Sequence, residues 1–214
     1  MKLYRVVKPQ HAHPDAALSG EGAAKDGGRW NPRGMAAIYC ATTPDTACAE
    51  FGYFHLIRPL VRSQQVGSWI FSPNIPGVLV EVDVSSDIHL KDISTPHTLQ
   101  RLAHRFDVSL TWNEATSPHL MNVQDKTTQL AKRLHKQNTP GLVTSSVRAP
   151  GTQCVVIFKD NVTSEALTIT HTQLVSFSAV VQGQAWSNQD LAEVDLHKIL
   201  VKRGDAQTLI SVAW

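Results

Sequence analysis

The chain has 214 residues, of which 42% are hydrophobic and 18% charged, which suits one folded domain, alone or with an appendage, and is unlike a disordered chain. Its 20 Lys and Arg nearly balance its 18 Asp and Glu, giving a formal net charge of +2, so general binding to nucleic acid or to a membrane surface is not expected. No run of about eighteen apolar residues occurs and no apolar stretch follows the N-terminus, so neither a membrane-spanning helix nor a signal peptide is expected.

The first half of the chain predicts two short strands and one capped helix. Leu3–Val7 has the composition of a strand, and Ala36–Ala41 is a short apolar run typical of a buried one. Residues 8–35, between them, hold Pro and Gly clusters and little periodicity, which indicates a long loop. Thr43 and Pro44 predict a helix start, with Thr as N-cap and Pro in the first turn, and the helix should extend to about residue 55 or 56.

The second half predicts more strands and at least two helices. Helices are expected over Leu99–Phe106, over Pro118–Lys136 and over residues 188–201, where Asn188 would be the cap and Gly204 would follow the end. Strands are expected at Val78–Val84, Leu142–Thr144, Cys154–Phe158, Ala166–Thr170, Leu174–Val181 and the final TLISVAW, which suits a sheet edge. Because helices and strands do not alternate regularly, the pattern favours a mixed α+β domain over a doubly wound sheet.

Cysteine and histidine usage argues against a metal site. The cysteines are Cys40, Cys48 and Cys154, an odd number at spacings that match no zinc motif. Cys40 and Cys48 are expected to be buried thiols, and the compartment is expected to be the cytoplasm. The ten histidines form no HExxH or comparable ligand spacing, so no catalytic metal is expected.

Three segments carry residues that could form a site. GGRWNPRG, from Gly27, combines glycines that let the backbone approach a ligand with Arg29, whose planar donors fit phosphate oxygens. In the following helix, Glu50 lies at the edge of an apolar arc, where a carboxylate is unfavourable unless it is hydrogen-bonded or functional. GLVTSSVRAPG, from Gly141, brings two serines and an arginine to a strand end.

Each segment also has an ordinary structural interpretation. The first could be a turn-rich surface loop with common basic residues. Glu50 could reach solvent and pair with Arg58, and the serines could cap a strand edge. Taken singly, none of the three segments decides between these interpretations and a functional site.

Together, the segments resemble the RES domain family, the toxins of Xre–RES toxin–antitoxin systems. The resemblance rests on LYRVV near the start, on GGRWNPRGMAAIYCATTPDTACAE, and on GLVTSSVR with the following CVVIF, and it covers roughly residues 2–160. It implies an ADP-ribosyltransferase-like α+β fold, with a central split and curved sheet flanked by helices. It also implies an NAD-binding catalytic core over residues 1–170, with residues 171–214 as a C-terminal extension packed on the same domain.

The resemblance further implies a function. Such a toxin would cleave NAD at the nicotinamide–ribose bond, pass ADP-ribose to phosphate or water, and be restrained by a cognate Xre-like antitoxin. NAD would be a substrate, and no metal or membrane would be needed. A mono-ADP-ribosyltransferase that modifies a protein target, or a non-catalytic nucleotide-binding module, remains an alternative, and a homodimer remains open.

Site residues carry over by position. The implied catalytic residues are Arg29, Tyr39, Glu50 and Ser146, and the implied NAD-binding residues are Arg5, Arg29, Trp30, Tyr39, Ser146 and Arg148. Many family members have Tyr-Pro before Ser-Val-Arg where this chain has Thr144 and Ser145, so Ser145 stays an alternative to Ser146. Glu50 would stabilise the ribose cation, the arginines would hold the pyrophosphate, and Tyr39 would stack on the nicotinamide or orient the ribose. Ser146 would bind the ribose or nicotinamide amide or position Glu50, while Trp30 and Phe51 would exclude water.

Overall fold

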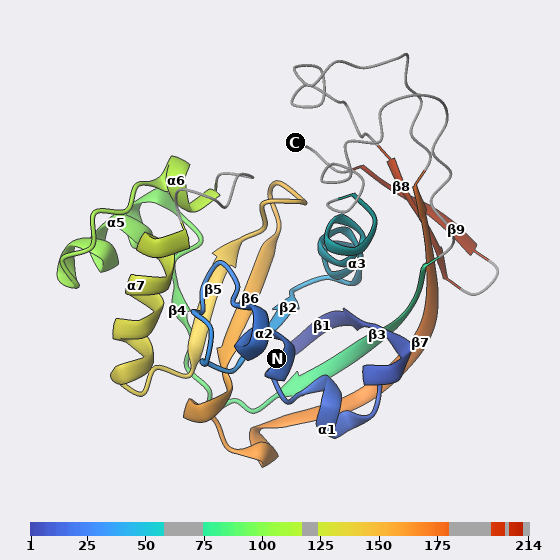
Figure 1. Ribbon diagram of the computed structural model, residues 1–214, viewed down its shortest axis with the longest axis horizontal. Coiled ribbons are helices and arrows are strands. Elements are labelled where there is room, and N and C mark those ends of the chain that lie inside the picture. The colour runs from blue at the N-terminus through green and yellow to red at the C-terminus, as the bar shows by residue number, and fades with distance from the viewer. Residues whose placement is uncertain (58–74, 117–123, 180–197, 204–205, 212–214) are drawn as a thin grey trace.

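The structure is a computed structural model that describes residues 1–57, 75–116, 124–179, 198–203 and 206–211 (Figure 1). Nine strands form one sheet in the order β4-β5-β6-β2-β1-β3-β7-β8-β9. Their bounds are β1 Lys2–Val7, β2 Ala37–Ala41, β3 Ile75–Val84, β4 Lys91–Asp92, β5 Gly141–Ser145, β6 Gln153–Phe158, β7 Leu167–Ala179, β8 Lys198–Arg203 and β9 Ala206–Ser211. Neighbouring strands are antiparallel except β4 and β5, which are parallel.

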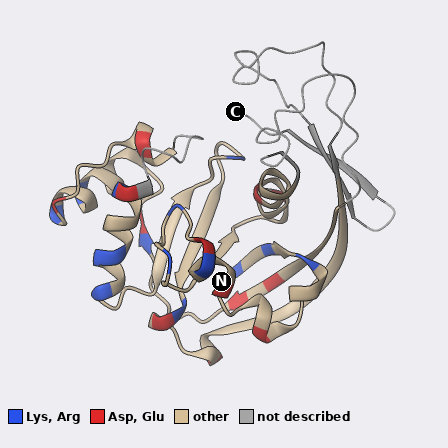
Figure 2. Ribbon diagram, in the orientation of Figure 1, with Lys and Arg blue, Asp and Glu red and all other residues tan. Residues whose placement is uncertain are grey.

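Helices lie beside both halves of this sheet (Figure 1). The α-helices are α1 Pro14–Ala17, α2 Glu21–Asp26, α3 Pro44–Gly52, α5 Pro96–Arg105, α6 Trp112–Thr116 and α7 Gln124–Lys136. The shorter turns are the 3-10 helices η1 Pro9–His11, η3 Lys159–Asn161 and η4 Ser164–Ala166, and the π-helix η2 Tyr53–Ile57, which continues α3. Figure 2 shows basic and acidic residues interspersed along the described chain, in keeping with the near balance of charge.

The sheet is split between β1 and β2. These two strands share a single paired position, Tyr4 with Ala41, whereas β2 and β6 pair over five positions and β1 and β3 over six. The sheet is also curved, as the long β3 and β7 show in Figure 1. The α+β fold with a split, curved sheet and flanking helices is therefore confirmed.

Three apolar clusters fix the layers. The face covered by α3 buries Ala47, Cys48 and Phe51 against Leu79 and Phe177 of β3 and β7. The helices α5, α6 and α7 bury their apolar sides against β5 and β6 in a second cluster. On the face opposite α3, the third cluster joins β1, β2, β3 and β6 with α1. Alternation along the strands assigns successive residues to opposite faces.

Two helix starts are explained by the same local signal. Thr43 accepts a hydrogen bond from the Thr46 backbone N–H at 3.2 Å, and Pro44 occupies the first turn of α3, as predicted. Thr95 caps α5 in the same way, with a capping box to Thr98. The helix predicted over Leu99–Phe106 therefore begins earlier, at Pro96.

Other element predictions need correction. Residues 8–35 are not one long loop, because they contain η1, α1 and α2, each too short to show helical periodicity in the sequence. The two strands predicted at Ala166–Thr170 and Leu174–Val181 are one strand, β7, whose polar middle is held by pairing with β3 across a bulge. Residues 198–201, expected to be helical, belong to β8, which pairs with β7 and β9.

Some expectations fall on residues that the structure does not describe. These are the start of the helix predicted from Pro118, the segment 188–197 with its proposed cap Asn188, Gly204, the ends of two predicted strands at residues 180–181 and 212–214, and Arg58 as a partner for Glu50. The helix is described from Gln124 to Lys136, where it agrees with the prediction. The strand near the C-terminus is β9, the last in the sheet order, as expected for an edge strand. The boundary expected at residue 170 falls inside β7.

Candidate functional site

The centre of the candidate site is a hydrogen bond between α3 and the end of β5. The Ser146 hydroxyl donates to Glu50 Oε1 over 2.7 Å. The same Ser146 oxygen accepts the backbone N–H groups of Arg148 at 3.2 Å and Ala149 at 3.0 Å. Because these two donors occupy the acceptor side of the hydroxyl, its proton is directed to Glu50. Ser146 is only 5% exposed, so the bond is shielded from solvent.

The neighbouring serine does not take part in this contact. Ser145 donates to the backbone carbonyl of Ser94 over 2.9 Å. Successive residues at the end of β5 point to opposite sides, which separates the two serines. Ser146, and not Ser145, is therefore the serine that contacts Glu50.

A second side chain reaches the same carboxylate oxygen. The Cys154 thiol, on β6, lies 3.4 Å from Glu50 Oε1. Cys154 pairs with Ala41 on one side and with Thr144 on the other. Burial, followed by the charge of Glu50, raises the pKa of the Cys154 thiol well above its usual range. The thiol is therefore neutral and acts as a hydrogen-bond donor.

Two arginines lie beside Glu50. Burial lowers the pKa of Arg29, and the charge of Arg148 lowers it further, while Glu50 raises it. Arg29 also donates to the Ala115 carbonyl of α6 over 2.9 Å. Arg148 is 3% exposed, and its Cζ lies 3.3 Å from the ring centroid of Tyr53, in η2. Among the described residues, two guanidinium groups and one carboxylate give this region more positive than negative charge, which favours an anionic ligand.

The loop that carries Arg29 is fixed by Tyr39 and Asn31. The Tyr39 hydroxyl donates to Asn31 Oδ1 over 2.8 Å and accepts the Trp30 backbone N–H over 2.9 Å. Asn31 is fully buried, and its amide nitrogen donates to the carbonyls of Ala23 and Met35, both at 2.9 Å. A Cβ on Gly28 would lie 2.4 Å from the Tyr39 oxygen, so only glycine fits at this close approach.

Consequently, three residues with predicted roles in the site have structural contacts of their own. Both hydrogen bonds of the Tyr39 hydroxyl are made to the loop, and burial raises the pKa of Tyr39 above its usual value. Trp30 is 3% exposed and packs in the cluster beneath α5–α7, so its ring belongs to the core. Phe51 is likewise buried, against Phe177, with ring centroids 4.8 Å apart.

The structure does not bring Arg5 together with Glu50. Arg5 shares one face of β1 with Leu3 and Val7, which lie in the cluster opposite α3. Its guanidinium donates to the Ala17 carbonyl over 2.6 Å, and burial lowers its pKa. The charge of Cys40, the residue that follows Tyr39 and faces the other way, acts on the pKa of Arg5 in the opposite direction to burial. Arg5 therefore lies on the far face of the sheet.

Of the residues that the sequence predicted for the site, the structure gathers Arg29, Glu50, Ser146 and Arg148. It also places Tyr53 and Cys154 beside them, which the sequence analysis did not include. Cys154 could have been found from the alternation of its strand, since it shares a face with Val156 and Phe158. The sequence holds no comparable signal for Tyr53, which depends on the π-helical turn after α3.

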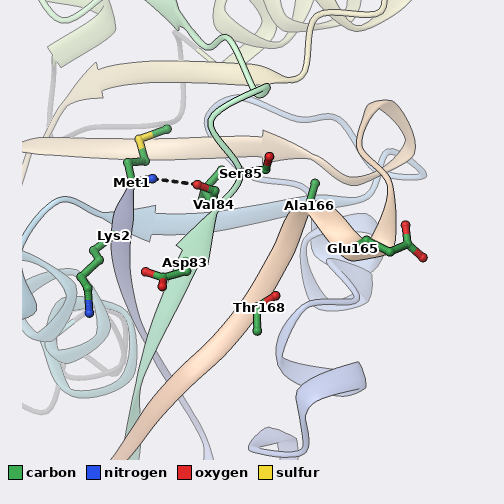
Figure 3. Close-up of a pocket in the computed structure, with 8 residues that line it drawn as sticks. All are labelled: Met1, Lys2, Asp83, Val84, Ser85, Glu165, Ala166 and Thr168. Carbon is green, nitrogen blue, oxygen red and sulfur yellow. Dashed lines mark hydrogen bonds between the residues drawn. The ribbon is translucent and has the colours of Figure 1, made fainter.

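Glu50 does not line either of two surface pockets. One, with a cavity volume of about 330 Å³, lies at the start of β1 and the end of β3 and is lined by Met1, Lys2, Asp83, Val84, Ser85, Glu165, Ala166 and Thr168 (Figure 3). There the N-terminal ammonium donates to the Val84 carbonyl over 2.7 Å. None of the residues around Glu50 lines it. In the described part of the chain, no group of three or more His, Cys, Asp or Glu could hold a metal ion, and no described helix is long and apolar enough to span a membrane.

Comparisons with known proteins identify a family and solved structures with a similar fold. The family model for the RES domain matches residues 2–179. A chain of the M. tuberculosis MbcT–MbcA toxin–antitoxin complex has a similar structure, with a TM-score of 0.58 and 19% sequence identity over 90% of this chain and 87% of that one. None of the curated proteins matches the sequence.

Proposed function

The chain belongs to the RES domain family, and from this membership we propose that it is the toxin of a toxin–antitoxin pair that cleaves NAD between nicotinamide and ribose. The observation that carries the proposal is the short hydrogen bond from Ser146 to Glu50, next to Arg29 and Arg148. A held carboxylate beside a positive region is what cleavage of a dinucleotide at a glycosidic bond requires.

The chemistry follows from the substrate. Nicotinamide in NAD is cationic, and when the C1′–N bond breaks its electron pair leaves with the nicotinamide nitrogen, so that the leaving group becomes neutral. No general acid is therefore needed, and positive charge develops on the ribose. Glu50 would stabilise that charge and hold a ribose hydroxyl, a favourable electrostatic effect because the carboxylate is already oriented.

The arginines would supply binding. Arg29 and Arg148 present the planar donors that suit pyrophosphate oxygens. An anion between them would offset the mutual repulsion that lowers the pKa of Arg29. In this proposal Tyr39 fixes the loop that aims Arg29, and Arg5 has no direct role, because its guanidinium lies on the other face of the sheet.

The acceptor and the partner complete the proposal. After cleavage, phosphate or water would attack the ribose carbon and release an ADP-ribose product. The similar fold in a toxin–antitoxin complex supports a cognate antitoxin as partner. The experiment is to incubate the purified protein with NAD, with and without phosphate, and to identify the products by mass. Nicotinamide should appear in both, with a phosphorylated ADP-ribose only when phosphate is the acceptor. ADP-ribose on a macromolecule without bulk NAD loss would instead indicate a protein-modifying transferase.

A further inference from the structure

Glu50 is held unevenly by its surroundings. Its Oε1 accepts from Ser146 at 2.7 Å and from Cys154 at 3.4 Å. Within the described residues no hydrogen bond reaches Oε2. Among the described residues, the protein therefore fixes Oε1 and not Oε2. Because the carboxylate is rigid, the groups that fix Oε1 also set the direction of Oε2.

The strand register places the two donors side by side. Cys154 pairs with Thr144 on β5, and Ser146 lies two residues beyond Thr144, on the same face. The thiol and the hydroxyl therefore meet Glu50 from neighbouring positions, since diagonal side chains on one face lie within reach of each other. The partner of Cys154 on β2 is Ala41, which carries no side-chain donor to compete for the carboxylate.

We propose that Cys154 is a positioning residue, which donates its thiol proton to Glu50 Oε1 and, together with Ser146, aims Oε2 at the substrate. The proposal rests on the proposed function, because it concerns the orientation of the same carboxylate. A neutral thiol suits this role. It donates without adding charge, and it stays protonated beside the carboxylate because burial and Glu50 both raise its pKa.

The first test compares three substitutions. Cys154→Val keeps the bulk of the side chain but removes the donor, and Cys154→Ser restores a donor. Cys40→Val, at a buried thiol on the opposite face of the sheet, is the matched control. We expect Cys154→Val to lower kcat for NAD about fivefold with little change in KM, the size appropriate to one weak hydrogen bond to a charge. Cys154→Ser should recover to within about twofold of the original rate, and Cys40→Val should not change it.

A direct spectroscopic readout keeps the proposal testable even where a variant folds poorly. The S–H stretching band of Cys154 is isolated as the infrared difference between the unsubstituted protein and Cys154→Val, with Glu50 intact. The same difference is then taken in a Glu50→Leu background. The band should lie at the low frequency of a hydrogen-bonded thiol with Glu50 present and move to higher frequency without it.

The outcomes separate the two proposals. If the unsubstituted protein leaves NAD intact, the proposed function fails, and with it any catalytic role for Cys154, whatever the infrared band shows. If NAD is consumed but Cys154→Val matches the original kcat, or Val and Ser lower it equally, the positioning role is wrong. An S–H band that ignores the loss of Glu50 would overturn it as well.

Discussion

The guanidinium of Arg148 stacks on the ring of Tyr53, with 3.3 Å between Cζ and the ring centroid. Tyr53 opens the π-helix that continues α3, so the helix that carries Glu50 also carries the surface on which Arg148 rests. A desolvated cation–π contact contributes about 2 kcal/mol. The contact therefore helps to hold a buried cation close to Arg29, which it repels.

The first prediction concerns this stack. Tyr53→Leu removes the ring and should let Arg148 shift. KM for NAD should rise about tenfold, which corresponds to about 1.4 kcal/mol, roughly two-thirds of the contact energy. Tyr53→Phe keeps the ring and should stay within about twofold of the original value. Steady-state NAD consumption by both variants is the measurement, and equal losses in Leu and Phe would show that the ring face is not what holds Arg148.

The second prediction concerns Ser146. Ser146→Ala removes the donor to Glu50 and leaves two backbone N–H groups without their acceptor. NAD turnover should fall about 10- to 100-fold and the free energy of unfolding by about 1–3 kcal/mol. Ser145→Ala is the matched control, because Ser145 donates to Ser94 and not to Glu50. A larger loss of turnover from Ser145→Ala would contradict the assignment of the functional serine.

The third prediction concerns pH. Burial, and secondarily the charge of Lys8, lowers the pKa of His55 from 6.5 to about 4. As pH falls below 6.5, His55 becomes protonated in the unfolded chain, whereas in the folded chain it stays neutral until about pH 4. The free energy of unfolding therefore falls as the pH is lowered from 6.5 to about 4.

The measurement for His55 is the urea midpoint at pH 7 and at pH 4.5. Because the ring is only half-buried, the protein should lose roughly 1 kcal/mol more than His55→Gln does between these two values. Identical pH dependence in both proteins would show that His55 titrates normally in the folded state.

Local signals in the sequence predicted part of the fold well. Thr43 and Pro44 identified the start of α3, because a cap needs only its nearest neighbours. β7 could not be recognised as one strand, because its polar middle resembles a turn until its pairing with β3 is known. Residues 198–201 likewise form a strand because they pair with β7 and β9, and the local sequence pattern does not indicate this pairing.

The site shows the same division between local and long-range information. Arg29 and Glu50 belong to one continuous segment, Gly27–Glu50, which can be recognised from the sequence. The resemblance grouped Arg5 with these residues by its position in the sequence. Its side chain lies on the other face of the sheet, and the sequence does not show which elements cover each face. The alternation of β6 indicates the face on which Cys154 lies, but its contact with Glu50 depends on the register between β6 and its neighbours.

The most direct test of the proposed NAD cleavage is the rate of nicotinamide release by Glu50→Gln, beside Glu165→Gln as a matched control at an exposed carboxylate. Glu50→Gln keeps the size of the side chain and removes the charge that would stabilise the ribose cation. Release should fall about 10²–10³-fold, with NAD binding changed only a few-fold, while Glu165→Gln behaves as the unsubstituted protein. Nicotinamide release by Glu50→Gln at the original rate would contradict the central role of this carboxylate.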